Sequence, residues 1–173
     1  MKRRDFVRTT ALISGCSLVA PSVLSRDVGR SKSVKSNRLT ILHTNDTHSN
    51  IDPFPMNHAK YPGKGGVARR YELIQKIRTE EENVLLLDAG DIFQGTPYFN
   101  FFGGEIELKL MSKMGYNAST LGNHEFDNGI EKLAKVLKNA NFPFLNANYT
   151  LKNTPLEDKI KSYEIFDLDG IKI

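Results

Sequence analysis

The sequence predicts an α/β fold built on a parallel sheet, and three observations support this class. Short apolar runs alternate with segments of helical periodicity along residues 39–146. The run at 84–87 is Val-Leu-Leu-Leu without alternation, which is typical of a strand that is covered on both faces. In addition, 39% of the 173 residues are hydrophobic and 25% are charged, which is enough apolar matter for one core. These features exclude a disordered chain, a collagen-like fibre and a protein with several membrane spans.

The predicted elements begin at residue 39. An apolar, β-rich run at 39–43 precedes a long loop of Asn, Pro and Gly at 45–66. Apolar residues at helical spacing predict a helix over 67–79, and the strand at 84–87 comes next. We then expect a helix, a strand, a second helix, a strand and a hairpin, over 106–114, 118–121, 130–137, 142–146 and 163–173.

Two turn signals define the ends of these later helices. Gly115 is placed to end the helix over 106–114 in a left-handed conformation. Asn128, with Glu131 three residues later, has the spacing of a capping box that opens the helix over 130–137.

The first 38 residues differ from the rest in charge and composition. They carry nine Lys and Arg against two acidic residues, whereas 39–173 carries 15 against 18. A basic start with Arg3 and Arg4, a short apolar stretch and small residues predict a twin-arginine signal peptide over 1–25. The Ser-rich segment 26–38 is typical of a flexible basic spacer. We therefore expect export by the twin-arginine machinery to the periplasm or cell surface. Because the body is slightly acidic, no nucleic-acid partner is expected.

Two alternatives remain for this N-terminal segment. One is an amphipathic helix of a protein that is not exported. The other concerns Cys16, since the residues before it resemble a lipoprotein cleavage box, and a lipid there would attach the chain to a membrane. Only seven residues separate Arg8 from Cys16, so we favour a small residue inside the signal, with cleavage closer to Ala20 or Ser25. A single cysteine also excludes an intrachain disulfide.

Polar clusters follow three of the predicted strands. In order, they are Asp46 with His48, Gly90 with Asp91, and the run 122–127. The carboxyl ends of parallel strands meet at one edge of a sheet, so we expect the three clusters to lie together there. Residues i and i+2 of an extended chain point the same way, which would let Asp46 and His48 hold one cation.

Each cluster alone also has a plain structural interpretation. Asp127 is placed to cap the following helix, and Asn-His pairs are common in turns. What favours a site is that all three clusters occupy equivalent strand ends. The other two histidines are interpreted as structural, with His43 pointing into the sheet and His58 in a polar loop.

The order Asp-x-His, Gly-Asp and Gly-Asn-His-Glu resembles the signature of the calcineurin-like metallophosphoesterases. The longer segments 41–48, 90–97 and 121–127 are similar to the bacterial 5′-nucleotidase and UDP-sugar hydrolase branch. The resemblance covers 39–173 and implies the amino-terminal portion of a four-layer α/β/β/α sandwich. It also implies an enzyme that hydrolyses phosphate esters of nucleotides.

The resemblance further implies two divalent cations as cofactors, drawn from Mn, Zn, Fe, Co or Mg. Asp46 and His48 would bind the first metal, Asp91 would bridge both, and Asn123 would bind the second. Two such cations clamp a phosphate and activate a water for attack on it. Carboxylate, amide and imidazole ligands suit several of these ions, so the sequence does not choose among them.

Two further residues receive roles from the same resemblance. His124 would act beside the metals, where it would steady the phosphoryl oxygens or the leaving group. Asp127 would orient His124 and set its protonation.

The sequence departs from the family in one respect. The family completes its metal site with three later histidines, in motifs that do not occur before Ile173. We therefore expect 39–173 to be the front part of a longer domain. One alternative is a truncated chain that binds metal or phosphate weakly and catalyses little.

Substrate identity also has alternatives. A 2′,3′-cyclic nucleotide and a sulfur-carrier thiosulfate ester are substrates of exported relatives. The aromatic cluster over 98–102 is interpreted as core or lid packing, with a platform for a nucleobase as the alternative.

Overall fold

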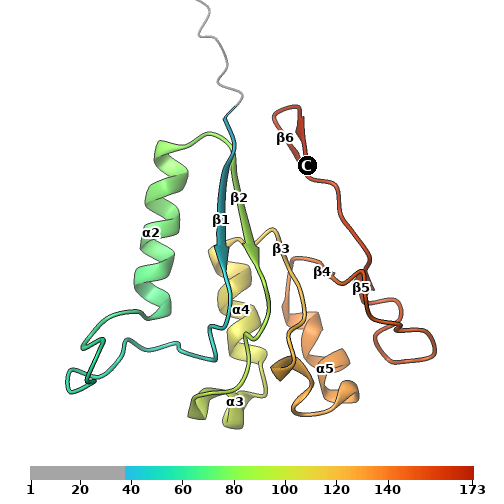
Figure 1. Cartoon of the computed structure of the whole chain (residues 1–173), viewed down its shortest axis with the longest axis horizontal. Helices are drawn as coiled ribbons and strands as arrows, with labels where there is room; N and C mark the ends of the chain where they lie inside the picture. Colours follow the sequence, from blue (N-terminus) through green and yellow to red (C-terminus); the bar gives the residue numbers. More distant parts are fainter. Residues whose placement is uncertain (1–37) are drawn as a thin grey trace, which may run out of the picture. The chain divides into compact units, whose positions relative to one another are not determined.

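A five-stranded parallel sheet organises the chain. The computed structural model describes residues 38–173, so the predicted signal peptide, Cys16 and nearly all of the predicted spacer lie outside the described residues. The strand order is β1-β2-β3-β4-β5, and every neighbouring pair is parallel (Figure 1). The strands are β1 (Thr40–Thr44), β2 (Val84–Asp88), β3 (Ala118–Ser119), β4 (Phe144–Leu145) and β5 (Ile160–Lys161). The predicted parallel α/β class is confirmed.

Helices fill the connections between these strands. The α-helices are α2 (Val67–Glu80), α3 (Pro97–Phe102), α4 (Glu105–Met114) and α5 (Ile130–Val136), and the short 3-10 helices are η2 (His124–Phe126) and η3 (Leu137–Asn139). An antiparallel hairpin of β6 (Asp167–Leu168) and β7 (Ile171–Lys172) follows the sheet. Within residues 38–173, no helix is both long and apolar enough to cross a lipid bilayer.

The core lies between the sheet and its helices. One buried cluster joins Leu86 of β2 to side chains of α2, α4 and α5, among them Ile74, Leu108 and Leu133. Leu42 of β1 packs against the same cluster. The alternate residues of β1, Ile41 and His43, are exposed. The expectation that His43 points into the sheet is therefore wrong, because strand alternation turns it to the face opposite the helices.

Several predicted boundaries differ from the structure. Helix α5 begins after Gly129, which is its N-cap and has a φ of 86°, and no side chain caps the helix. The predicted capping box of Asn128 and Glu131 is therefore wrong. Helix α3 was not predicted, although Pro97 at its first turn and left-handed Gly103 at its end are ordinary boundary residues. Strand β5 was also missed, since two residues carry too little pattern.

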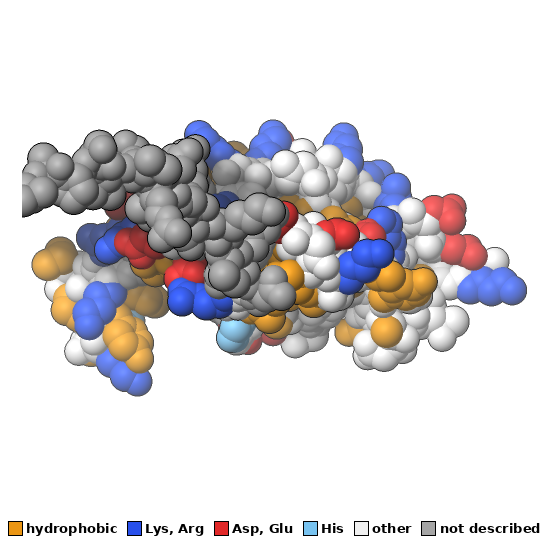
Figure 2. All heavy atoms as spheres, turned by 90° about the horizontal axis from the view of Figure 1, so that it is seen from above, with side chains coloured by type: hydrophobic (Ala, Val, Ile, Leu, Met, Phe, Trp, Pro, Cys, Tyr) orange, Lys and Arg blue, Asp and Glu red, His pale blue; other side chains and the backbone are white. Residues whose placement is uncertain are grey.

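The aromatic cluster divides into buried and exposed members. Phe99 is 3% exposed and its ring lies 5.4 Å from that of Phe93, so the core-packing interpretation holds for it. Phe101 and Phe102 are exposed instead. Other large apolar side chains at the surface include Tyr163 and Ile165. Figure 2 shows such hydrophobic side chains among charged ones on the face seen from above.

Candidate metal centre and its histidine partner

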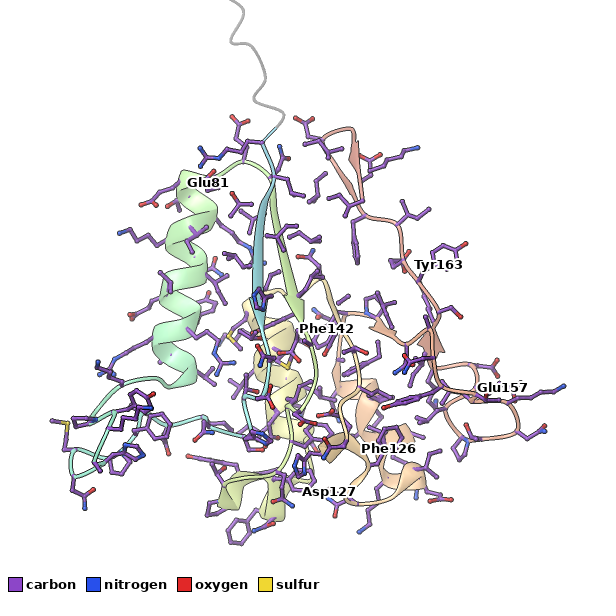
Figure 3. All side chains as sticks on the ribbon, viewed as in Figure 1. Glu81, Phe126, Asp127, Phe142, Glu157 and Tyr163 are labelled. Atoms are coloured by element: carbon purple, nitrogen blue, oxygen red, sulfur yellow. The ribbon has the colours of Figure 1, made fainter. Side chains whose placement is uncertain are left out.

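The three polar clusters do meet at the carboxyl edge of the sheet. Strands β1, β2 and β3 are parallel neighbours, and each cluster begins two or three residues after its strand ends. Figure 3 places Asp127, at the end of the third cluster, beside α3 and at the end of the molecule toward which β1 and β2 run. The topology thus confirms the predicted meeting of the three clusters at this edge of the sheet.

The loop after β1 is held against the loop after β2 by backbone hydrogen bonds. The Asp46 N–H donates to the Gly90 carbonyl at 3.0 Å, and the His48 N–H donates to the Asp91 carbonyl at 3.1 Å. Asp46, His48 and Asp91 have φ values of 51°, 44° and 54°. An extended backbone was expected at Asp46 and His48, and that expectation is wrong. Left-handed turns, stabilised by the neighbouring loop, bring their side chains together.

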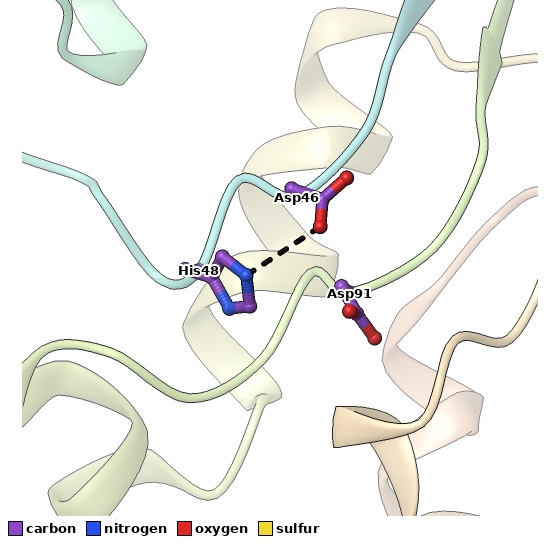
Figure 4. A group of neighbouring side chains, drawn as sticks. All are labelled: Asp46, His48 and Asp91. Atoms are coloured by element: carbon purple, nitrogen blue, oxygen red, sulfur yellow. Dashed lines mark ion pairs between the residues drawn. The ribbon is translucent and has the colours of Figure 1, made fainter.

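Asp46, His48 and Asp91 form a group that could hold a metal ion. Each offers one ligand atom, and these atoms lie within 4.8 Å of one another (Figure 4). His48 Nε2 is 3.7 Å from Asp46 Oδ1. Its Nδ1 lies 3.2 Å from the Phe93 carbonyl oxygen, which can only accept, so Nδ1 carries the proton and Nε2 is free to coordinate. The donor set therefore fits a divalent cation.

Two glycines allow the loops after β2 and β3 to approach this closely. A Cβ on Gly122 would lie 2.1 Å from Asp91 Oδ1, and a Cβ on Gly90 would lie 2.5 Å from the Gly122 nitrogen. Gly90 also has a φ of 94° and donates its N–H to the buried carboxyl of Asp88. Burial raises the pKa of Asp88, although its hydrogen bonds oppose that shift.

His124 lies against the metal-binding group from the third cluster. Its ring centroid is 5.1 Å from that of His48 in an edge-on contact. Its backbone N–H donates to Asp91 Oδ1 at 3.1 Å. His124 Nδ1 lies 2.8 Å from Asp127 Oδ2, which also accepts a bond from Gln94 Nε2 at 3.1 Å. The bond to Asp127 raises the pKa of His124, and the bond from His124 is the main cause that lowers the pKa of Asp127.

Asn123 occupies the turn between Gly122 and His124, and its side chain is exposed. The structure therefore gathers Asp46, His48 and Asp91 into one group, with Asn123 and His124 on the adjoining turn. Asp127 is not one of the three residues of the group and bonds to the His124 ring beside it.

Glu125 is a residue whose contribution the sequence did not reveal. It is 1% exposed, and its carboxylate accepts backbone N–H bonds from both loops. Burial raises its pKa, and those hydrogen bonds oppose the shift. Its place inside the Gly-Asn-His-Glu motif was visible in the sequence.

A cavity of about 350 Å³ opens beside the metal-binding group. Asp46, Asn50 and Arg70 line it, together with the ring of Phe54. Of the three residues of the group, Asp46 lines this cavity, so a ligand bound there would contact the Asp46 side of the group.

Fold and site together define an α/β protein with a cation-binding group and a carboxylate-oriented histidine at the carboxyl edge of a parallel sheet. The family described as "Calcineurin-like phosphoesterase" matches residues 39–172, and the chain belongs to that family. This confirms the family that the three motifs indicated.

Proteins similar to this chain include 5′-nucleotidases and an NAD nucleotidase. A snake venom 5′-nucleotidase from Gloydius brevicauda is 44% identical over 142 residues, which are 78% of this chain and 24% of that protein. The crystal structure of a 5′-nucleotidase precursor from Thermus thermophilus has a TM-score of 0.71 at 39% identity. The structure of an NAD nucleotidase from Haemophilus influenzae has a TM-score of 0.68, also at 39% identity. These two matches cover 78% of this chain and 27% and 25% of theirs. The chain therefore spans about a quarter of the length of these relatives.

Proposed function

We propose that this chain forms the metal-binding part of an exported phosphoesterase that hydrolyses phosphate esters of nucleotides, as 5′-nucleotidases do. The observation that carries the proposal is the Asp46, His48 and Asp91 group, with His124 against it. Similarity to 5′-nucleotidases favours a nucleotide over other phosphate esters. Export rests on the proposed signal peptide over 1–25, which is followed by a spacer over 26–38 and the phosphoesterase domain over 39–173.

Two divalent cations are proposed as cofactors. Asp46 and His48 would hold the first, Asp91 would contribute to both, and Asn123 would hold the second through its amide oxygen. When bound, the cations would supply positive charge to the phosphate and lower the pKa of an attacking water. A neutral Asn ligand leaves the site with net positive charge, which attracts an anionic ester.

His124 supplies the acid chemistry that the chain itself carries. Because Nδ1 is bonded to Asp127, Nε2 is the ring atom available to a substrate. The raised pKa of His124 keeps Nε2 protonated to higher pH, so this atom can donate to a phosphoryl oxygen or to the departing oxygen. Asp127 fixes the orientation of the ring and stabilises its charged form.

The test uses the full-length protein and compares 5′-AMP, UDP-glucose, 2′,3′-cyclic AMP and a thiosulfate ester as substrates. We expect hydrolysis of 5′-AMP that EDTA abolishes and Mn²⁺ or another divalent cation restores. Asp91→Ala should lower kcat by at least about 100-fold, since loss of this ligand removes the cations. Asp158 is an exposed aspartate outside the site, so the control variant Asp158→Ala should leave kcat unchanged. Hydrolysis that survives EDTA, or no hydrolysis with any divalent metal, would refute the proposal.

A further inference from the structure

Glu125 is the most completely bonded carboxylate at the site. Its Oε1 accepts the N–H groups of Ile92 at 2.7 Å and Phe93 at 3.3 Å. Its Oε2 accepts the N–H groups of Asp91 at 3.1 Å and Gly122 at 2.5 Å. A carboxylate can accept at about four lone-pair positions, so four backbone donors match its full capacity.

These donors come from two different loops. Asp91, Ile92 and Phe93 follow β2, whereas Gly122 follows β3 and lies in the same turn as Glu125 itself. The side chain therefore ties the β2 loop to the β3 turn at a point that is 1% exposed. A further bond links the two loops: Asp91 Oδ1, on the β2 loop, accepts the backbone N–H of His124, in the β3 turn.

The segment 91–93, whose N–H groups bond to Glu125, also contacts His48 of the metal-binding group. The Phe93 carbonyl oxygen faces His48 Nδ1, so the peptide unit that follows the bonded Phe93 N–H sets the tautomer of His48. Asp91 and His48 both depend on the path of the chain over 91–93. Since left-handed conformations at non-glycine residues cost free energy, the fold must supply contacts that hold them.

We propose that Glu125 is the positioning residue of the metal centre, and that it fixes the spacing and orientation of the two ligand-bearing loops. The four hydrogen bonds of its carboxylate all come from backbone N–H groups, so it acts through the backbone of Asp91 to Phe93 and of Gly122. This role of Glu125 rests on one part of the proposed function, namely that Asp46, His48 and Asp91 bind a divalent cation.

Isosteric substitution is the sharpest probe. Glu125→Gln keeps the size, but its amide NH₂ cannot accept, so two of the four backbone N–H groups lose their acceptor. Glu125→Asp keeps the charge and shortens the reach by one methylene. Glu107→Gln is the matched control, because Glu107 is also a buried glutamate, at 4% exposed, and its carboxylate accepts no hydrogen bond from the described residues.

The experiment measures Mn²⁺ affinity by calorimetry, and kcat and KM for 5′-AMP, on the full-length protein at a temperature where circular dichroism shows each variant folded. We expect Glu125→Gln to weaken Mn²⁺ binding by about 10- to 100-fold, the range seen when groups that orient metal ligands are removed. At saturating Mn²⁺, KM should stay within about threefold, because Glu125 does not touch the substrate, while kcat falls. Glu125→Asp should give an intermediate affinity, and Glu107→Gln should bind Mn²⁺ as the wild type does.

An Mn²⁺ affinity of folded Glu125→Gln equal to that of the wild type would overturn the inference and leave the proposed function standing. A wild type that binds no divalent cation would instead refute the proposed function. Hydrogen exchange of the metal-free wild type covers the case in which Glu125→Gln does not fold. The four bonded N–H groups should exchange far more slowly than those of exposed loops, and fast exchange there would overturn the inference on its own.

Discussion

At the scale of single residues, the site depends on backbone conformations that its residue types do not favour. Asp46, His48 and Asp91 all have positive φ, and their N–H and C=O groups bond across the two loops. Aspartate tolerates the left-handed region better than most residues, and histidine tolerates it less readily than glycine. Backbone of this kind persists when surrounding contacts determine it, and it is common at ligand sites. The positions of Asp46, His48 and Asp91 therefore depend on the bonds between the β1 and β2 loops, and neither loop sets them alone.

The pair of His124 and Asp127 leads to a prediction about pH. Asp127→Asn removes the carboxylate that raises the pKa of His124, so that pKa should fall toward its usual 6.5. The His124 pKa can be followed by NMR titration of the ring protons in metal-free protein. Gln94→Ala serves as the control, since Gln94 bonds to Asp127 and not to the His124 ring, and it should shift the His124 pKa much less. An unchanged His124 pKa in Asp127→Asn would contradict the assigned cause.

The same pair fixes the sign of a stability effect. The folded-state pKa of His124 is raised, so its contribution is fully present below 6.5 and is lost as pH rises through the raised value. The pKa of Asp127 is lowered, so its contribution is present above 3.8 and is lost as pH falls through the lowered value. The stability that Asp127→Asn removes should therefore be largest between these limits. Both side chains are about a third exposed, at 33% and 31%, so solvent screens the pair and the effect should be small. Urea denaturation at about pH 3, 5 and 9 measures it.

At the scale of elements, the sequence predicted those helices and strands that have a clear periodic pattern of apolar residues. Helices α2 and α4 and strands β1 and β2 appear where apolar spacing placed them, because each buries a face against the shared core. Strand β5 has two residues and was missed, since its pairing with β4 depends on contacts distant in sequence. The candidate site residues were chosen from the three motifs, and the structure brings Asp46, His48 and Asp91 into one group. Their left-handed backbone and the bonds made by Glu125 were not predictable, because both arise from the meeting of two loops.

The close approach of the β2 and β3 loops gives a second prediction. Gly122→Ala would place a Cβ 2.1 Å from Asp91 Oδ1, so the loops must separate. We expect a loss of about 2–4 kcal/mol in the free energy of unfolding, as for other severe steric changes, together with weaker metal binding. Gly170→Ala is the control: its Cβ meets nothing within 4 Å, and only its φ of 88° should cost about 1–2 kcal/mol. Equal losses in the two variants would show that the approach of the loops is unimportant.

Helix α4 offers a stabilising substitution. Glu107 is 4% exposed, and among the described residues neither of its carboxylate oxygens has a hydrogen-bond partner. It lines a small cavity of about 20 Å³ together with apolar side chains and the polar residues Ser49 and Arg70. Glu107→Leu should therefore raise the free energy of unfolding by about 1–3 kcal/mol, the usual cost of a buried group without a partner.

Urea denaturation checks this prediction, with Glu105→Leu as the control on the same helix. Glu105 is exposed and pairs with Lys109, so its replacement should change stability by less than about 0.5 kcal/mol. A Glu107→Leu variant that is less stable than the wild type would mean that Glu107 has a partner, such as a water in the 20 Å³ cavity.

At the scale of the whole molecule, the two faces of β1 are unequal. Leu42 packs against the core, whereas Ile41 is 53% exposed on the opposite face, and β1 is the first strand in the sheet order. Exposed apolar residues on an edge strand favour pairing with another chain. A domain of residues 39–173 by itself would carry this surface into solution.

We therefore expect residues 39–173, expressed alone, to self-associate. Light scattering coupled to size exclusion should give a mass above that of one chain, increasing with concentration. Ile41→Thr keeps β propensity and removes the apolar contact, so it should shift the mass toward the monomer. Phe101→Ser removes a side chain that is 82% exposed but belongs to α3 and not to β1, and it should leave the association unchanged. If the wild-type segment is a monomer that unfolds in one sharp thermal transition, the exposed face of β1 does not drive association. In that case the sheet is stable without a covering layer.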